Sequence, residues 1–517
     1  MKLKTEKKMD LFIPLLILSA VMLLCIIFLN SRICGEIFSW SFVIIVFLAG
    51  IMWLVSENSK SDNLIKSCCE NTNWISVLSC FGILVRYFYI VYTDVFTRQH
   101  DIGEFGDEGH LGYIWYLYSN NFSLPQSDPR DIWQFYHPPL HHIIEALWLK
   151  LLVFFGVSDS YEVLYTCIQI PLFIYSCAAM WIIYRIFREL GLQEKGLILS
   201  YALVCFNPTF ILMSGSANND LLSSVFIYAS VLYTILWYKN PCMKNIIKIA
   251  LSIGLGMMTK LSVALIAPAV ALVFAVKFIQ QVKRKNMFPF SFQYIVFLII
   301  CCPLGLWWSI RCYLKFGMPL NYIAEIPEDS FQYLGHMSWL ERITDFSLYQ
   351  FKNVFIQWNF NGDSYLEFNP FIAFMKTAVF GEFDFNDFNL HLIIAPKILF
   401  YSNIALMIIS FISMIYITAS RKSKLNPLIK VFLITVFLIF SANYLIFCYK
   451  YPFTCTMNIR YVTVLIVLGI YFTGAAYERT DCSKSRYGIA AGFIIPIISF
   501  IFAGASLFSY TALACIR

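Results

Sequence analysis

The sequence predicts an all-α polytopic membrane protein with about 13 transmembrane helices. Hydrophobic residues make up 59% of the 517 residues and charged residues only 13%, whereas soluble domains carry roughly 25% charged residues. Apolar stretches of about 18 residues or more recur along the whole chain, and each is long enough to cross the ~30 Å hydrocarbon core of a bilayer. These two observations exclude an ordinary soluble protein.

The basic residues are concentrated in alternate loops between the expected spans, and this distribution predicts which loops face the cytoplasm. We expect spans at about 11–29, 37–55, 74–93, 163–187, 196–213, 219–237, 244–258, 261–279, 292–311, 396–418, 428–447, 459–476 and 487–512. Cytoplasmic loops are enriched in Lys and Arg, and most of the 38 basic residues lie in alternate connections or in the helix ends beside them. The net charge of +7 therefore signals membrane orientation rather than nucleic-acid binding. The lysine-rich stretch Met1–Asp10 is expected to anchor a retained first helix on the cytoplasmic side.

Two long segments, 94–162 and 312–395, are expected on the outer side of the membrane. With their flanking residues they hold most of the 31 acidic residues. They also hold all seven histidines, which are His100, His110, His137, His141, His142, His336 and His391. The chain is therefore expected to divide into an N-terminal two-helix addition with a cytoplasmic linker (1–73), a transmembrane core that contains the first outer loop (74–311), the second outer loop, and C-terminal transmembrane helices (396–517).

The first outer loop is expected to contain two short helices. The stretch 138–155 is apolar enough to cross a bilayer but carries two histidines, a glutamate and a lysine, so an amphipathic helix in the outer interface is favoured over a span. Residues 106–119 are expected to begin a second such helix, because the carboxylates of Asp107 and Glu108 suit a helix N-terminus. A helix that begins near Asp107 would place His110 on the same face.

Short polar motifs lie at predicted helix ends on the outer side. They are Asp107-Glu108 after a span, the turn His137-Pro138-Pro139-Leu140, the stretch from Asn207-Pro208 to Asp220, the turn from Gly254 to Lys260, Trp307-Trp308 with Arg311, and Arg460-Tyr461 at the start of a late helix. Their order resembles the C superfamily of membrane glycosyltransferases (GT-C), and most closely the branch of the protein O-mannosyltransferases and the lipid A aminoarabinose transferase, glycosyltransferase family 39. The resemblance covers most of the chain from about residue 74. It departs from the family at Pro303, which comes early, and at His137, where relatives often carry lysine.

This resemblance implies an inverting glycosyltransferase that takes a sugar from a polyprenyl-phosphate carrier and attaches it to an acceptor on the extracytoplasmic side. Such chemistry needs a carboxylate that accepts the proton of the acceptor hydroxyl. By resemblance Asp107 takes this role, with Glu108 as its neighbour in the motif and Asp101 as the reserve candidate. The alternative for Asp107 and Glu108 is a solvated helix cap.

The lipid phosphate leaves with negative charge and needs cations around it. Lys260, Arg311 and Arg460 lie at predicted outer helix ends, and Arg86 lies in the outer half of a span, where an unpaired charge is costly. Lys260 and Arg311 are the first choices, and snorkelling to lipid headgroups is the alternative for all four. Three further candidates for contact with substrate or phosphate are His137, His110 and Asp220. A capping histidine at the interface is the alternative for His137, and a structural turn is the alternative for Asp220.

The histidines leave a divalent metal open as a cofactor. Side chains suited to a metal are Asp101, Asp107, His110, His137, His141 and His142. Their spacing does not resemble a known metal site, so no cofactor is required beyond the polyprenyl-phosphate sugar that serves as donor substrate. Cys448 and Cys455 are able to pair on the outer side, and the sequence does not decide whether they do.

Two other functions fit a many-pass protein with large outer loops. A transporter or flippase for lipid-linked saccharides would place charges near the bilayer midplane and often carries inverted repeats, whereas the charges here lie at outer helix ends. A polymerase or ligase for lipid-linked saccharides lacks an Asp-Glu helix directly after a span. The expected partners are a polyprenyl-phosphate-linked sugar, membrane lipids and a lipid, glycan or protein acceptor, with no nucleic acid. By resemblance the protein is expected in a bacterial plasma membrane with its active site facing outward.

Overall fold

The computed structural model describes residues 74–97, 101–283, 288–348, 353–355, 358–360, 363–382, 394–420, 425–480 and 486–511. The two predicted N-terminal spans lie outside these residues, as do His100 and His391. Within them the chain is α-helical apart from short 3-10 turns and one two-stranded antiparallel sheet. The predicted all-α class is therefore confirmed for this part of the chain.

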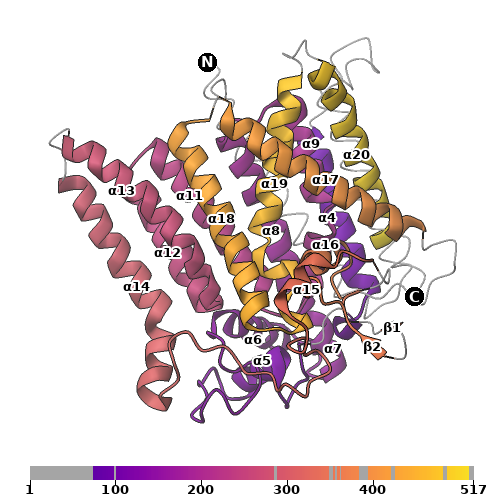
Figure 1. Ribbon diagram of the computed structural model, residues 1–517. Helices are drawn as coiled ribbons and strands as arrows, with labels where there is room; N and C mark the ends of the chain where they lie inside the picture. Colours follow the sequence, from indigo (N-terminus) through magenta and orange to yellow (C-terminus); the bar gives the residue numbers. More distant parts are fainter. Residues whose placement is uncertain are drawn as a thin grey trace.

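Long apolar helices form the body of the bundle (Figure 1). Among the described residues, eight stretches are long and apolar enough to cross a membrane. They lie in α4 (Trp74–Tyr92), α7 (Tyr161–Cys167) with α8 (Gln169–Glu189), α11 (Asp220–Lys239), η3 (Leu261–Ile266) with α13 (Ala267–Lys283), α14 (Phe288–Phe316), α17 (Ile394–Ala419), α18 (Pro427–Lys450) and α20 (Arg486–Thr511). Each coincides with a predicted span.

Two bent helix pairs raise the number of candidate spans to ten. One pair is α9 (Glu194–Cys205) with α10 (Pro208–Leu212) and η2 (Met213–Gly215), bent by 46°, and the other is η5 (Thr454–Thr456) and η6 (Ile459–Val462) with α19 (Val464–Arg479), bent by 50°. Both fall on predicted spans. The predicted span 244–258 corresponds to α12 (Met243–Thr259), which has only 17 residues. The expected count of about 13 spans is therefore not confirmed by the part of the chain that the structure describes.

The bend between α9 and α10 follows from the dipeptide Asn207-Pro208. Proline disfavours helical backbone in the residue before it, and Asn207 is extended, with φ −70° and ψ 124°. The Asn207 side chain accepts a hydrogen bond from Thr209 N (3.0 Å) and so caps the new helix. A span is thus interrupted at buried residues, and a polar turn runs from Ser214 to Asp220.

The first outer loop packs as a layer at one end of the bundle, the lower end in Figure 1. This layer contains α5 (Gly109–Ser119) and α6 (Leu140–Phe154), and their apolar side chains share a core with those of α7, which begins the following candidate span. α6 buries one face, and its other face and C-terminal end expose Leu147, Leu151, Phe154 and Phe155. A helix is present where the sequence predicts one at 138–155, and it is not among the candidate spans of the described residues. Its place in a bilayer interface stays a prediction.

The second outer loop folds onto the chain that precedes η6. Its elements are α15 (Trp339–Thr344), the antiparallel strands β1 (Trp358–Phe360) and β2 (Asp363–Tyr365), in which Trp358 pairs with Tyr365, and α16 (Pro370–Phe380). Leu334 N donates to Pro452 O (2.7 Å), and Thr454 N donates to Gln332 O (3.0 Å). These backbone bonds fasten the loop to the segment that leads into η6.

The two cysteines near this junction are not joined. Cys448 and Cys455 are both free thiols, and Cys448 Sγ donates to Thr456 O (3.8 Å). The disulfide that the sequence left open is therefore not formed in the structure.

Candidate functional site

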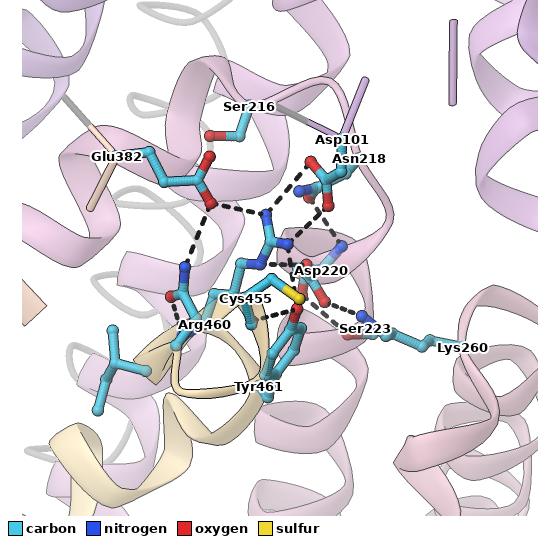
Figure 2. Close-up of polar contacts among 12 residues, drawn as sticks. Asp101, Ser216, Asn218, Asp220, Ser223, Lys260, Glu382, Cys455, Arg460 and Tyr461 are labelled. Atoms are coloured by element: carbon cyan, nitrogen blue, oxygen red, sulfur yellow. Dashed lines mark hydrogen bonds and ion pairs between the residues drawn. The ribbon is translucent and has the colours of Figure 1, made fainter. Parts of the chain in front are cut away.

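Five charged side chains meet between the first outer loop and several helix ends (Figure 2). We call them the Arg460 cluster, and its members are Asp101, Asp220, Lys260, Glu382 and Arg460. The Arg460 guanidinium contacts three carboxylates. Its Nη2 lies 2.6 Å from Asp101 Oδ2 and its Nε lies 3.3 Å from Asp220 Oδ2. Its Nη1 lies 3.6 Å from Glu382 Oε1, and Lys260 Nζ pairs with Asp220 Oδ1.

The cluster is largely removed from solvent. The side chains of Asp220, Arg460, Glu382 and Asp101 are 3%, 5%, 6% and 10% exposed, whereas that of Lys260 is 17% exposed. Three carboxylates and two cations sum to a charge of −1 when all are ionised. Buried charges are tolerated only when they are paired, which the cluster achieves by sharing its cations. Lys260 is the cation most open to a ligand.

Asp101 is held by a tight turn that packs against the start of α5. Leu111 N donates to Ile102 O (2.8 Å), which ties the residue after Asp101 to the first turn of that helix. Gly103 has φ +64°, and a Cβ atom there would lie 1.9 Å from Glu108 O. Glycine alone accommodates this left-handed backbone and close approach. The turn therefore directs Asp101 into the cluster.

Asp220 and Lys260 come from neighbouring helix ends that are hydrogen-bonded together. Asp220 is the first residue of α11, and Lys260 follows Thr259, the last residue of α12. Asn219 Nδ2 donates to Thr259 O (3.1 Å). A carboxylate is stabilised at the positive N-terminus of a helix and a cation at the negative C-terminus, so both charges are favoured where they lie.

Arg460 is fixed by a cap and by an aromatic ring. Asn458 Oδ1 accepts a hydrogen bond from Arg460 N (3.1 Å), and Asn458 Nδ2 donates to Glu382 Oε1 (3.4 Å). Arg460 Nη2 also donates to Tyr461 OH (3.1 Å). Lys260 Nζ lies 4.7 Å from the centre of the Tyr461 ring, a cation–π contact. Tyr461 therefore touches both cations of the cluster.

Four histidines form a group beside the cluster, in which His110, His141 and His142 are buried and His137 is half-buried. The His110 ring stacks on His137 (5.4 Å) and on His142 (5.3 Å), and His110 Nδ1 lies 3.0 Å from His142 Nε2. His141 Nδ1 lies 3.9 Å from Glu145 Oε1. Burial lowers the pKa of all four imidazoles, to about 3 for His137 and His141, with the charge of Lys260 as a second cause for His137. Burial raises the pKa of Glu145 well above its ordinary value, so burial favours the neutral form of every member of the group.

The predicted catalytic carboxylates lie in two different environments. α5 begins at Gly109, so Asp107 and Glu108 precede the helix, and both are exposed. His110 is buried, and the predicted common helix face of Asp107 and His110 is wrong because the left-handed Gly109 (φ +83°) turns the chain between them. Asp101, the reserve candidate, is the carboxylate of this loop that reaches the Arg460 cluster. A catalytic role for Asp107 stays a prediction.

Arg86 is placed differently from the predicted phosphate contact. It is fully buried, and its Nε donates to Ser176 Oγ (2.8 Å). Its Nη1 donates to Gly82 O (2.8 Å) and Cys205 O (2.7 Å), and its Nη2 donates to Val204 O (3.3 Å). These acceptors include the last carbonyls of α9, which the break before α10 leaves without helical partners. Arg86 therefore caps this helix end, and its predicted phosphate contact stays a prediction.

The other predicted cations divide between the cluster and its surroundings. Lys260 and Arg460 are members of the cluster. Arg311 lies outside it, where Nη2 donates to Pro125 O (2.7 Å) and the guanidinium lies 5.1 Å from the centre of the Trp308 ring. Arg311 therefore joins α14 to the first outer loop, and its predicted phosphate contact stays a prediction.

The predicted metal ligands do not converge. Within the residues that the structure describes, no group of three or more His, Cys, Asp or Glu side chains is arranged to hold a metal ion. Asp107 is exposed, whereas His110, His137 and His141 lie in or against the histidine group. These residues therefore do not fit a metal site as they stand.

Sequence analysis did not single out Glu382. This residue follows α16, which Asn369 caps by accepting hydrogen bonds at Oδ1 from Phe371 N (2.8 Å) and Ile372 N (3.0 Å). The Asn-Pro start and Gly381 (φ +55°) after the last helical residue were the available signals for a helix inside the second outer loop. They indicate where the acidic residue lies along the chain, but not that it meets Arg460.

Part of the chain matches a known protein family. Residues 136–307 match the sequence model of a family described as dolichyl-phosphate-mannose-protein mannosyltransferase. The chain resembles this family of membrane enzymes. The resemblance expected from the motifs is thereby confirmed. The matched segment contains Asp220 and Lys260, whereas Asp101 and Arg460 lie outside it.

Similar solved structures include an oligosaccharyltransferase and ArnT. The oligosaccharyltransferase of Archaeoglobus fulgidus, tethered to an acceptor peptide with the NVT sequon, matches at a TM-score of 0.48 and 13% identity over 85% of this chain and 55% of that chain. ArnT of Cupriavidus metallidurans, bound to undecaprenyl phosphate, matches at a TM-score of 0.45 and 11% identity over 86% of this chain and 77% of that chain. The chain thus spans about half the length of the oligosaccharyltransferase. A comparison with curated proteins found no match.

Proposed function

We propose that the protein is an inverting glycosyltransferase of the GT-C type, which moves a sugar from a polyprenyl-phosphate donor to an acceptor on the extracytoplasmic side of a membrane. The observation that carries this proposal is the buried pair of Asp101 and Arg460 (2.6 Å), with Lys260 beside it in the same cluster (Figure 2). One carboxylate and two cations are the groups that the reaction requires.

Asp101 is the residue that we assign as general base. The acceptor hydroxyl oxygen attacks the anomeric carbon of the sugar while its proton passes to the Asp101 carboxylate. The bond from the anomeric carbon to the phosphate oxygen breaks, and its electron pair leaves with the polyprenyl phosphate. Arg460 orients the base through its bond to Asp101 Oδ2. The exposed position of Asp107 supports this choice between the two predicted carboxylates.

Lys260 and Arg460 are assigned to the departing phosphate, because cations that meet developing negative charge lower the barrier. The Lys260 ammonium has three N–H donors, and the structure uses one on Asp220. Lys260 is therefore able to bind a phosphate oxygen while it keeps that partner. Asp220 then holds Lys260 in place beside Arg460, since its second oxygen lies 3.3 Å from Arg460 Nε.

An apolar cavity near the cluster suits part of a polyprenyl tail. Its volume is about 290 Å³, and its lining includes Phe374, Leu406, Leu445 and Ile466. α16 connects the cavity with the cluster, because Ala378 lines the cavity and Glu382 follows the end of the same helix. A charged head at the cluster and an isoprenoid tail in the cavity would match the two ends of the donor.

The sidedness of the site is also part of the proposal. α13, which ends in Lys283, has its C-terminal end at the opposite end of the bundle from the first-loop layer (Figure 1). Cytoplasmic ends are rich in Lys and Arg, so this arrangement supports an outward-facing cluster. The position of the charges at helix ends favours the enzyme over a transporter. By family resemblance we propose a bacterial plasma membrane as the location.

The substitution Asp101→Asn tests the proposal. Purified protein in vesicles, supplied with a panel of polyprenyl-phosphate sugars, is expected to lose at least about 100-fold in transfer rate, because general base catalysis contributes about 10²–10⁴-fold. Asp107→Asn is the matched variant in the same loop and is expected to retain transfer. Full activity of Asp101→Asn in a folded protein would overturn the assignment of the base. Loss of activity in Asp107→Asn alone would return the role to Asp107.

A further inference from the structure

Glu382 is the member of the Arg460 cluster that comes from the second outer loop. Its Oε1 lies 3.6 Å from Arg460 Nη1 and accepts a hydrogen bond from Asn458 Nδ2 (3.4 Å). Its backbone oxygen accepts a hydrogen bond from Asn353 Nδ2 (3.1 Å). The side chain is 6% exposed. A buried carboxylate is thus held in a defined position against the guanidinium.

One nitrogen of Arg460 serves two carboxylates from different loops. Nη1 lies 3.4 Å from Asp101 Oδ1 and 3.6 Å from Glu382 Oε1. Both distances are longer than the 2.6 Å between Nη2 and Asp101 Oδ2. Nη1 carries two N–H groups, so it is able to face both carboxylates at once, and neither contact is as short as the bond from Nη2.

We propose that Glu382 is a positioning residue that shares Arg460 with Asp101, so that the second outer loop controls how firmly the base in the first outer loop is paired. The catalytic part of this inference rests on the proposed function. The sharing itself does not, because it concerns only the packing of three side chains.

Charge counting shows why the sharing stabilises the fold. Replacing either Asp101 or Glu382 by its amide changes the cluster charge from −1 to 0, and Arg460 keeps a carboxylate from the other loop. Replacing both leaves Asp220 alone between Arg460 and Lys260, with a buried charge of +1. A buried charge without enough opposite charge beside it is strongly destabilising. The second replacement therefore lowers the free energy of unfolding by more than the first.

The same geometry fixes the effect of Glu382 on the base. The charged groups near Asp101 are Arg460, Lys260, Asp220 and Glu382, and the neutral groups facing it are Tyr136, His137, Cys455 and Tyr461. In Glu382→Gln one negative charge beside the shared Arg460 guanidinium is removed. The loss of this like charge favours the ionised form of Asp101. The Asp101 carboxylate then becomes a weaker base that stays ionised to lower pH.

The first experiment measures coupling without any need for activity. Melting temperatures of the full-length protein, Asp101→Asn, Glu382→Gln and the double variant are compared in the same detergent. The melting temperature of the double variant is expected to fall by more than the sum of the two single decreases, because the effects of residues that share a partner are not additive. The control pairs Asp101→Asn with Glu325→Gln, because Glu325 is an exposed carboxylate of the second outer loop, as Glu382 is a buried one. The losses of melting temperature in this control pair are expected to add. Additive losses for Asp101 and Glu382 would overturn the sharing.

The second experiment follows the pH dependence of sugar transfer. Glu382→Gln is expected to move the acid limb of kcat/KM by about one pH unit to lower pH and to lower the plateau, whereas Glu325→Gln leaves the limb in place. Glu382→Asp is expected to restore part of the shift. An acid limb that Glu382→Gln leaves unmoved in an active enzyme would overturn the control of the base. Absence of transfer from every donor by the unaltered protein would count against the proposed function, and the melting experiment would still decide the sharing.

Discussion

His141→Leu isolates the free energy of burying an imidazole that lacks hydrogen-bond partners. His141 is fully buried, and neither of its ring nitrogens has a hydrogen bond within the described part of the chain. Burial lowers its pKa to about 3, whereas an imidazole in an unfolded chain titrates near pH 6.5. The folded protein therefore keeps His141 neutral over a pH range in which the unfolded chain binds a proton.

The sign of the effect follows from proton linkage. The folded-state pKa lies below the unfolded value, so the stability is fully present above about pH 6.5 and is lost as the pH falls. Between pH 7.5 and pH 5.0, the unfolded chain gains about 2 kcal/mol from protonating this one side chain. The unaltered protein should lose that much more unfolding free energy than His141→Leu over the same interval. Glu145 and the other three histidines of the group are present in both proteins, so their contributions largely cancel.

The assay is denaturant or thermal unfolding of the purified protein at pH 7.5 and pH 5.0. His336→Leu serves as the matched control, because His336 is exposed and should leave the pH dependence unchanged. Equal losses of stability on acidification in the unaltered protein and in His141→Leu would refute the reasoning. Such a result would mean that His141 carries a proton in the folded state, as it would in a salt bridge with an ionised Glu145.

Two further predictions concern the parts of the fold that position the cluster. Gly103→Ala should reduce both the yield of folded protein and sugar transfer, because φ is +64° there and the new Cβ would lie 1.9 Å from Glu108 O; melting temperature and transfer rate check this. Lys376→Met should lower the free energy of unfolding by about 3–5 kcal/mol, since it leaves Glu367, now 2.5 Å from the Lys376 ammonium, buried without its partner. The double variant with Glu367→Leu should recover most of the loss in the same unfolding assay.

Much of the fold could be predicted because long apolar runs leave few alternatives. The spans from α4 to α20 were found by length and hydrophobicity, which the bilayer imposes on any spanning helix. The start of α5 was placed two residues early, because acidic residues suit a helix N-terminus but a left-handed glycine at Gly109 delays the helix. Hydrophobic pattern carries no information on the backbone angle of a glycine.

The site was predictable residue by residue but not as an assembly. Asp220, Lys260 and Arg460 were candidates because each lies at a helix end, and the structure brings them together. Asp101 and Asp107 are acids in one short loop, and sequence alone does not say which side chain turns inward. The deciding contact, from Asp101 to Arg460, joins segments far apart in the chain, and such pairings are set by tertiary packing alone.

Helix ends explain how a mostly apolar protein can hold this charge cluster. Asp220 begins α11, Lys260 follows α12, Glu382 follows α16 and Arg460 lies in the short η6 before α19. At such ends, backbone N–H and C=O groups lack helical partners. Their partial charges favour a carboxylate at the start of a helix, as at Asp220, and a cation at the end of a helix, as at Lys260. A charge in the middle of a span would have neither benefit. The breaks at Asn-Pro and the Asn caps are therefore part of the site, since they create the polar ends between which the Arg460 cluster forms.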